Sequence, residues 1–429
     1  MKTSSKHLST VLALALAVFM WGYCAHGRQL TEQRLTVSGF PERNFSDLFP
    51  RWLGTRELLL HGHDPYSVEI TREIQRGYYG RPIDSARATD PIDEQRFAYP
   101  LFVVFLLAPT IALPFNAVKA AFTVILLAAA IWTVLLWIRV IGLKPGHDKT
   151  LTYILLTLAT IPYAQGIQFQ QLSVLVVFFV AVGVYALANK QFIVAGLSLA
   201  LATIKPQLSV YLIACVLLWS AWRWGLRKSI AISFCAVLVV FIAASELLLP
   251  GWPSEFFAGI QPYLHYTQAT TGIHELFGRV GETIVLALLA IVTALAVWRA
   301  RSKPVDSDEF KLAISLALAF TCISIPSLAP HNQVLLVPGY LLLVKEGDWI
   351  RSGGRLARSL WWGAWLTLIW PWVAGTLLVA TFVFDRASSR LWDLPLATNP
   401  LIPITLFGAL APLLIRRMGR RDHAVERSR

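Results

Sequence analysis

Residues 117–141 read AVKAAFTVILLAAAIWTVLLWIRVI, an apolar run interrupted by charge only at Lys119 and Arg139. A helix needs about 20 such residues to cross the hydrocarbon core of a bilayer. Further apolar runs lie on either side, at 8–23, 97–115, 150–166, 172–188, 191–204, 206–222, 228–249, 281–299, 309–327, 331–345, 358–382 and 401–416. Only 15% of the 429 residues are charged, whereas about a quarter are charged in a soluble domain. The sequence therefore predicts an all-α polytopic membrane protein and excludes a soluble globular one.

Positive charges gather in short clusters between the apolar runs, most clearly at 222–228, 299–303, 345–358 and 416–421. Because cytoplasmic loops collect lysine and arginine, we expect these clusters inside, together with Lys190. Alternation along the chain then places outside the stretches 165–171, 250–280, 327–333 and 384–399, and Lys205. The net charge of +13 follows from this orientation and does not indicate a nucleic-acid partner.

The number of apolar runs conflicts with the charge rule. Thirteen crossings from an inside N-terminus would leave the arginine-rich C-terminus outside. Either one run does not cross or one assignment is wrong. Residues 97–115 contain three prolines and are the candidate for a re-entrant segment. We therefore expect roughly 12 transmembrane helices of ordinary length.

These assignments divide the chain into four parts. Residues 1–27 form the first transmembrane helix, which we expect to stay uncleaved because no cleavage motif follows it. Residues 28–96 form a large extracytoplasmic loop, 97–416 the multi-span transmembrane domain, and 417–429 a basic cytoplasmic tail. The loop contains no lysine, and its arginines are nearly balanced by acidic residues, so it can be translocated.

Two short helices are expected within this loop. Ser46 would cap the first and Gly62 would end it, while Ser67 would open the second and Gly77 would end it. Both are amphipathic and too short to cross a bilayer, so we expect them to lie along the membrane surface.

Three residues stand out as candidates for chemistry. Asp47 lies at the start of the first loop helix, where the helix dipole stabilises a carboxylate, and it fits a general base or an ordinary capping residue. Lys205 interrupts apolar sequence on the outer side, and it either binds a phosphate or extends its amine to the interface. His331 lies at an outer helix mouth, where catalytic and structural roles are both open.

A polar turn on the outer side carries four glutamines, which either hydrogen-bond sugar hydroxyls or simply polarise the loop: Gln165, Gln168, Gln170 and Gln171. The acidic stretch Asp90-Pro-Ile-Asp93-Glu94 is expected to be a solvated loop, and no acidic pair in the first loop is spaced to hold a divalent ion. We therefore expect no metal and no cofactor.

The pattern Asp47…Arg51-Trp…Gly54…Leu60-His-Gly62-His-Asp64-Pro65-Tyr66 resembles the first-loop signature of glycosyltransferase family 87, the polyprenyl-phosphate-mannose-dependent mannosyltransferase group of the bacterial GT-C enzymes. Four more elements match in order: Phe97-Ala-Tyr99-Pro100, Gln171-Leu-Ser173, Lys205-Pro206 and His331. The similarity reaches to about residue 345. One departure is the family's usual double proline, which is here Pro100 followed by Leu101.

The resemblance implies a GT-C fold with its active site on the outer face of a bacterial plasma membrane. It implies that Asp47 is the general base on the acceptor hydroxyl, that His331 assists, and that Lys205 binds the donor phosphate. Further substrate-binding candidates come from the matching motifs: Arg51, Tyr99, Gln171 and Gln207. A single base without a covalent nucleophile predicts inversion at the anomeric carbon.

The expected function is thus transfer of a hexose, with mannose the expected sugar, from a polyprenyl-phosphate donor to a glycolipid or glycan acceptor. Two other functions stay open from the sequence. A transporter or flippase for lipid-linked sugars would share the helices and the outer cations, and it would show inverted hydropathy repeats. A non-catalytic membrane scaffold would need neither Lys205 nor Asp47.

Overall fold

The computed structural model describes residues 4–40, 44–84, 86–87, 89–266, 270–325, 329–384 and 393–426. Within these ranges the chain is helical, without a strand. Its first part contains α1 (Ser4–Val37), α2 (Phe49–His61), α3 (Val68–Tyr79), α4 (Val103–Leu107), η1 (Ala108–Thr110) and α5 (Phe115–Ile141). The middle contains α6 (His147–Leu158), α7 (Ile161–Gln168), α8 (Leu172–Ala188), α9 (Phe192–Leu201), η2 (Ala202–Ile204), α10 (Pro206–Trp222) and α11 (Trp224–Leu248). The last part contains α12 (Trp252–Tyr266), α13 (Gly272–Ala300), α14 (Asp308–Ser324), η3 (Pro330–Leu336), α15 (Val337–Ser352), α16 (Arg355–Phe384), η5 (Leu394–Thr398) and α17 (Leu401–Glu426).

Among the described residues, six helices are long and apolar enough to cross a membrane, or up to seven if α7 and α8 form one bent span. The roughly twelve expected spans therefore stay a prediction. The reason is that several apolar helices are short: α9 stops at η2, and α10 is only 17 residues long. Residues 97–115 contain only α4 and η1 before α5, so they do not form a spanning helix.

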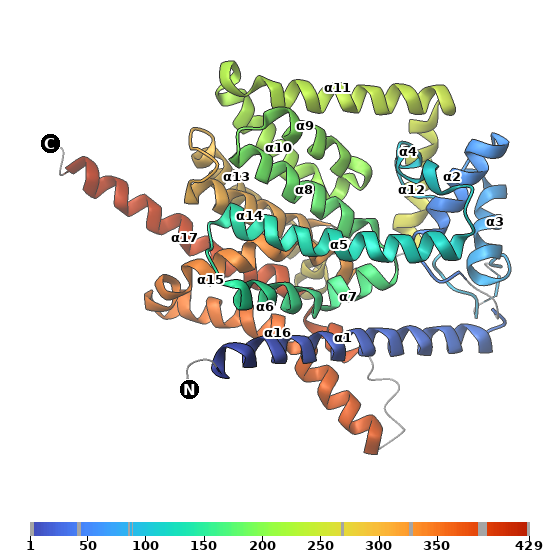
Figure 1. Cartoon of the computed structure of the whole chain (residues 1–429), viewed down its shortest axis with the longest axis horizontal. Coiled ribbons are helices and arrows are strands. Elements are labelled where there is room, and N and C mark those ends of the chain that lie inside the picture. Colours follow the sequence, from blue (N-terminus) through green and yellow to red (C-terminus); the bar gives the residue numbers. More distant parts are fainter. Residues whose placement is uncertain are drawn as a thin grey trace.

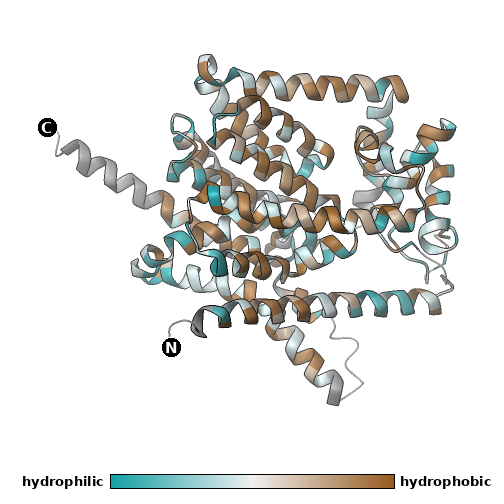
Figure 2. Cartoon of the chain, in the orientation of Figure 1, coloured by the Kyte–Doolittle hydropathy of each residue, from teal (hydrophilic) through white to brown (hydrophobic). Residues whose placement is uncertain are grey.

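The long helices run roughly along the longest axis of the molecule. In Figure 1, α5 crosses the centre, α1 and α11 lie along opposite sides, and α2, α3, α4 and α12 gather at one end. The hydropathy colouring of Figure 2 shows brown apolar residues along the middle of these helices and teal residues concentrated toward the ends. This distribution is the one expected of a bundle whose central band faces lipid.

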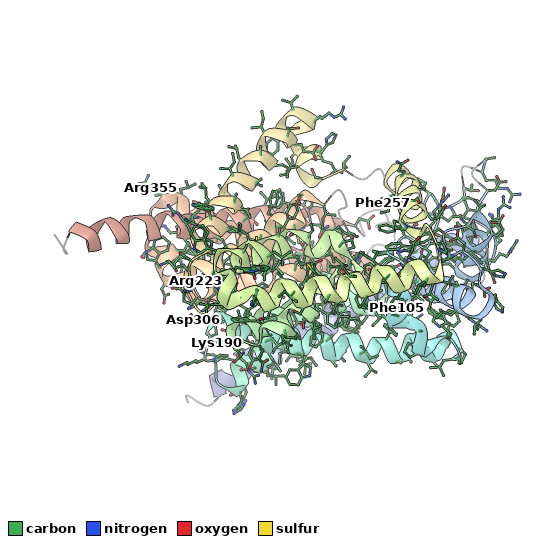
Figure 3. All side chains as sticks on the ribbon, turned by 90° about the horizontal axis from the view of Figure 1, so that it is seen from above. Phe105, Lys190, Arg223, Phe257, Asp306 and Arg355 are labelled. Atoms are coloured by element: carbon green, nitrogen blue, oxygen red, sulfur yellow. The ribbon has the colours of Figure 1, made fainter. Side chains whose placement is uncertain are left out.

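Two of the basic clusters predicted to lie inside, 222–228 and 299–303, are in contact, and a third, 345–358, is held by an ion pair. The guanidinium of Arg227 donates hydrogen bonds to the carbonyl oxygens of Trp219 at 2.7 Å and Arg301 at 3.2 Å. Lys345 pairs with Asp308 at 3.0 Å. Figure 3 shows Lys190, Arg223, Asp306 and Arg355 toward one end of the long axis, and Phe105 and Phe257 toward the other.

Three predicted boundaries differ from the structure or fall outside it. Helix α1 continues to Val37, past the predicted end at residue 27, and its polar extension carries the Arg28–Glu32 ion pair at 2.9 Å. Helix α17 continues to Glu426, so most of the predicted basic tail is helical. Parts of three predicted outer stretches, 267–269, 327–328 and 385–392, lie outside the described residues.

The two helices expected in the first loop are present, with two corrections. Gly62 ends α2 with a left-handed φ of 70°, and Ser67 caps α3 by accepting from the Ile70 amide at 3.2 Å, as predicted. Ser46 is not the cap of α2, because that helix begins at Phe49 and Leu48 is its N-cap residue; the Ser46 hydroxyl accepts from the Leu48 amide at 3.3 Å and donates to the Gln170 side-chain oxygen. The last residue of helix α3 is Tyr79, and its C-cap is Gly80 instead of the predicted Gly77.

Gly77 serves packing instead of ending α3, because a side chain there would collide with the Phe49 ring. The apolar face of α2 is also covered by protein. The Phe49 and Trp52 rings lie 4.9 and 5.2 Å from the Phe115 ring at the start of α5. Helix α2 is therefore anchored on the bundle, and its amphipathic pattern does not require contact with the membrane surface.

Candidate active site

Four segments that are distant in sequence bring their polar side chains together. Asp47 precedes α2, Gln171 lies between α7 and α8, Lys205 lies between η2 and α10, and Asn332 lies in η3. The amide of Gln171 donates to the Asp47 carboxylate. The Lys205 amine donates to the Gln171 side-chain oxygen at 3.4 Å, to Ser173 at 3.3 Å and to the Asn332 side-chain oxygen at 3.2 Å. A carboxylate and an amine are thus joined through one neutral amide.

The position of Asp47 is fixed by the turn between α7 and α8. Its backbone amide donates to the Phe169 carbonyl at 2.9 Å, and the Ser46 hydroxyl donates to the Gln170 side-chain oxygen at 2.7 Å. Gln170 has a positive φ of 51° in this turn, where the axes of α7 and α8 meet at a bend of 116°. The bend directs the glutamine-rich turn against the start of α2.

Arg51 adds a second cation to the same region. Its guanidinium donates to the Asp47 carbonyl oxygen at 2.9 Å and lies 4.6 Å from the centre of the Tyr99 ring. The Arg51 Nε is buried and has no hydrogen-bond partner among the described residues. A guanidinium with a free donor is suited to bind an anion such as phosphate.

His331 lies in η3 directly before Asn332, close to Gly166 of α7. Burial lowers the pKa of His331 well below its usual range, and the charges of Lys205 and Arg51 lower it further. The imidazole is therefore neutral at physiological pH and can accept or donate a hydrogen bond without adding charge.

The ionisation of the two central groups is shifted by their surroundings. Burial raises the pKa of Asp47, while the Arg51 charge, the Gln171 hydrogen bond and the Lys205 charge oppose the rise. Burial and, to a smaller extent, the Arg51 charge lower the pKa of Lys205 to about 7, against the opposing effect of Asp47. Asp47 is thus a stronger base than a free carboxylate, and the amine of Lys205 titrates near neutrality.

The remaining predicted site residues divide into two groups. Tyr99 is buried beneath Arg51, and Gln171 occupies the centre of the cluster. Gln207 is exposed on the first turn of α10 and makes no contact with this cluster among the hydrogen bonds of the described residues, so its substrate-binding role stays a prediction. Lys205 is buried just before α10, whereas Gln207, two residues later, is exposed on that helix.

Sequence reasoning missed Asn332 and Ser173, both of which accept hydrogen bonds from Lys205. Their positions in the sequence could have indicated them, because Asn332 directly follows His331 and Ser173 is the last residue of the Gln171-Leu-Ser173 motif. Asp90 was expected to be solvated, but its side chain is 1% exposed and accepts two 2.7 Å hydrogen bonds from Arg81. These hydrogen bonds lower the pKa of Asp90 to about 2, so the carboxylate stabilises the loop as an ion pair.

An apolar cavity of about 720 Å³ lies beside η3. Its walls come from α1, α6, α7, α15, α16 and the segment before α17, and they include Met20, Tyr163, Trp365 and Trp372. Gln333, which follows His331 and Asn332, is one of its few polar lining residues. A cavity of this size and lining suits a hydrocarbon chain more than a free sugar.

Comparison with known proteins gives one match. The model of glycosyltransferase family 87 matches residues 97–326, a range that includes Tyr99, Gln171 and Lys205. No curated protein and no solved structure matches the chain. Because the matched range covers more than half of the 429 residues, this chain belongs to glycosyltransferase family 87.

Proposed function

We propose that this membrane glycosyltransferase is an inverting GT-C enzyme that transfers mannose from a polyprenyl-phosphate donor to a glycolipid or glycan acceptor. The reaction takes place on the outer face of the bacterial plasma membrane. Family membership supports sugar transfer in general. The observation that carries the finer proposal is the joined array of Asp47, Gln171 and Lys205, in which one amide links a carboxylate to an amine; these groups are suited to act as a base and as a phosphate-binding cation.

In the proposed reaction, Asp47 removes the proton from the acceptor hydroxyl as its oxygen attacks the anomeric carbon. The bond between that carbon and the phosphate oxygen breaks, and the polyprenyl phosphate leaves with the bonding electrons. Lys205 and Arg51 stabilise the phosphate charge that develops. Because the attack and the departure occur on opposite faces of the sugar, the anomeric configuration inverts. The leaving group is already good, so no strong general acid is needed.

The apolar cavity supports a lipid-linked substrate. It is bounded by Gln333, two residues beyond His331, so a hydrocarbon chain in the cavity would have its polar end near η3. The neutral imidazole of His331 would hydrogen-bond the sugar or the phosphate there. A nucleotide-sugar donor has no long hydrocarbon chain and would leave such a cavity unused.

The proposal is tested by transfer from radiolabelled polyprenyl-phosphate-mannose into a lipid extract, with purified wild-type protein and Asp47→Asn. Losing the general base should lower the rate by about 10²–10⁴-fold, because Asn keeps the shape and cannot accept the proton. Asp84→Asn is the matched control, since Asp84 is an exposed carboxylate of the same loop and should leave the rate unchanged.

Three results would count against the proposal. Equal rates in wild type and Asp47→Asn would remove Asp47 from the mechanism. A product that retains the donor's anomeric configuration would contradict the single displacement. Movement of the intact donor across vesicles without transfer would indicate a transporter. Polyprenyl-phosphate-glucose, assayed in parallel, tests whether mannose is the preferred sugar.

A further inference from the structure

A second cluster of chemically active side chains lies at the far end of α2, away from the residues of the transfer reaction. One carboxylate oxygen of Glu57 lies 2.9 Å from His61 Nδ1 and 3.2 Å from His63 Nδ1. One ligand atom from each of the three residues lies within 4.8 Å of the others. Two imidazole nitrogens and a carboxylate oxygen converging on one point are the ligand types that zinc prefers.

The backbone fixes this arrangement. Glu57 and His61 are one turn apart on the same face of α2, so their side chains are neighbours. Gly62 then takes a left-handed φ of 70° and donates to the Leu58 carbonyl at 3.0 Å, and the His63 amide donates to the Glu57 carbonyl at 3.2 Å. This turn folds His63 back over the helix end, which brings the second imidazole to the same carboxylate.

Electrostatics also favours a cation at this point. The Glu57 side chain is only 10% exposed and lies near the C-terminal end of α2, where the helix dipole is unfavourable to negative charge. The histidines are its side-chain partners among the described residues. A carboxylate with so little exposed surface needs a hydrogen-bond donor, a paired charge or a metal ion to balance it.

We propose that Glu57, His61 and His63 bind one divalent transition-metal ion, with zinc as the best fit. In a tetrahedral site, with ligands about 2.0–2.1 Å from zinc, neighbouring ligand atoms lie about 3.3–3.4 Å apart. The two Glu57–imidazole separations of 2.9 and 3.2 Å are close to this value, and the two imidazoles, whose ligand atoms lie within 4.8 Å of each other, are exposed and free to adjust. The imidazole side chains are 51% and 58% exposed, which leaves the ion accessible and its fourth position open to water. The ion ties the end of α2 to the following turn.

The test uses the full-length protein, purified with a tag that contains no histidine, stripped with EDTA and dialysed against zinc chloride. Elemental mass spectrometry should find about one zinc ion per chain in the wild type. His61→Ala, His63→Ala and Glu57→Gln should each lose most of it. Zinc should also raise the unfolding temperature of the wild type and not of these variants. Magnesium and calcium should bind poorly because they prefer all-oxygen sites.

The matched control is His274→Ala. His274 pairs with Glu282 at 2.9 Å, the same separation as His61 and Glu57, but no second histidine joins that pair among the side chains that the structure describes. Its replacement should leave the bound zinc unchanged. The proposal fails if the stripped and reloaded wild type holds no more zinc than the His61→Ala/His63→Ala double variant, when both elute as single species. The three residues would then be a carboxylate hydrogen-bonded to two imidazoles. Because zinc is measured directly, this outcome is independent of sugar transfer.

Discussion

At the scale of single residues, the most informative side chain is Lys205. It is 8% exposed, and the groups that accept its hydrogen bonds are neutral: two amide oxygens and one hydroxyl. A buried amine costs free energy unless an anion balances it, and Asp47 is reached only through Gln171. The free site therefore holds its cation in a position that a phosphate would stabilise.

Replacing Lys205 should weaken donor binding more than it disturbs folding. A hydrogen bond to a charged group contributes about 1.5–3 kcal/mol, so Lys205→Ala should raise the donor KM by roughly 10- to 150-fold. Lys144→Ala, which removes an exposed lysine, is the control and should leave KM unchanged. Steady-state kinetics with varied donor concentration gives the result, and an unaltered KM for Lys205→Ala would show that another group binds the phosphate.

The pH dependence of transfer should be bell-shaped. Asp47 must be ionised to accept a proton, and its pKa is raised, so kcat/KM should fall as the solution becomes acidic. The pKa of Lys205 is about 7, so its charge is present below that pH and is lost above it, which weakens donor binding. Arginine stays charged at all accessible pH values. Lys205→Arg should therefore shift the alkaline limb upward, and an unchanged limb would assign it to a different group.

At the scale of helices, α9 and α11 pack closely at Gly196. A methyl group at Gly196 would lie 2.5 Å from the Ile230 carbonyl oxygen and 2.9 Å from the Phe234 amide nitrogen, and it would also collide with Ser233. Small residues allow helix backbones to approach in this way in membrane proteins. The obstacle is backbone, which cannot rotate away as a flexible side chain can.

Gly196→Ala should therefore separate α9 from α11 and destabilise the protein by about 1–3 kcal/mol, the usual cost of overpacking. Gly363→Ala in α16 is the comparison, because nothing lies within 4 Å of a methyl group there. Alanine is a better helix former by up to about 1 kcal/mol, so Gly363→Ala should be neutral or stabilising. Thermal unfolding of both variants in the same detergent measures the difference. Equal unfolding temperatures would mean that α9 and α11 can move apart without cost.

At the scale of the whole molecule, the basic turns between helices and the first loop lie at opposite ends of the long axis. The basic turns after α8, α10, α13 and α15 share one end, and the loop helices α2 and α3 occupy the other (Figures 1 and 3). The positive-inside rule then predicts that α2, α3 and the turn bearing Lys205 face the outside.

This orientation can be measured with a membrane-impermeant thiol reagent. In a chain whose four native cysteines are replaced, Asp84→Cys should be labelled in intact cells, because Asp84 is exposed in the first loop. Ser352→Cys, exposed at the end of α15, should be labelled only after the membrane is permeabilised. The reverse pattern would place the site in the cytoplasm and exclude the proposed extracytoplasmic donor.

The amino-acid sequence alone is enough to assign this protein to the helical membrane proteins. Backbone groups in a bilayer must satisfy their hydrogen bonds within the segment, so long apolar runs specify helices without reference to the rest of the chain. The same local logic predicted the end of α2 at Gly62 and the cap of α3 at Ser67. Asp47, Lys205 and His331 could each be selected as unusual residues at expected helix ends.

Which of the candidate site residues are in contact depends on the tertiary structure. Gln171 contacts Asp47 across 124 positions, and Lys205 contacts Asn332 across 127. Such contacts depend on how helices cross and bend, as at the 116° break between α7 and α8, and no local pattern encodes that angle. The same dependence explains why Gln207, only two residues after Lys205, is exposed, and why Asp90 is buried against Arg81. Helix formation is a local property of the chain, whereas the joining of a base to a cation is a property of the packing.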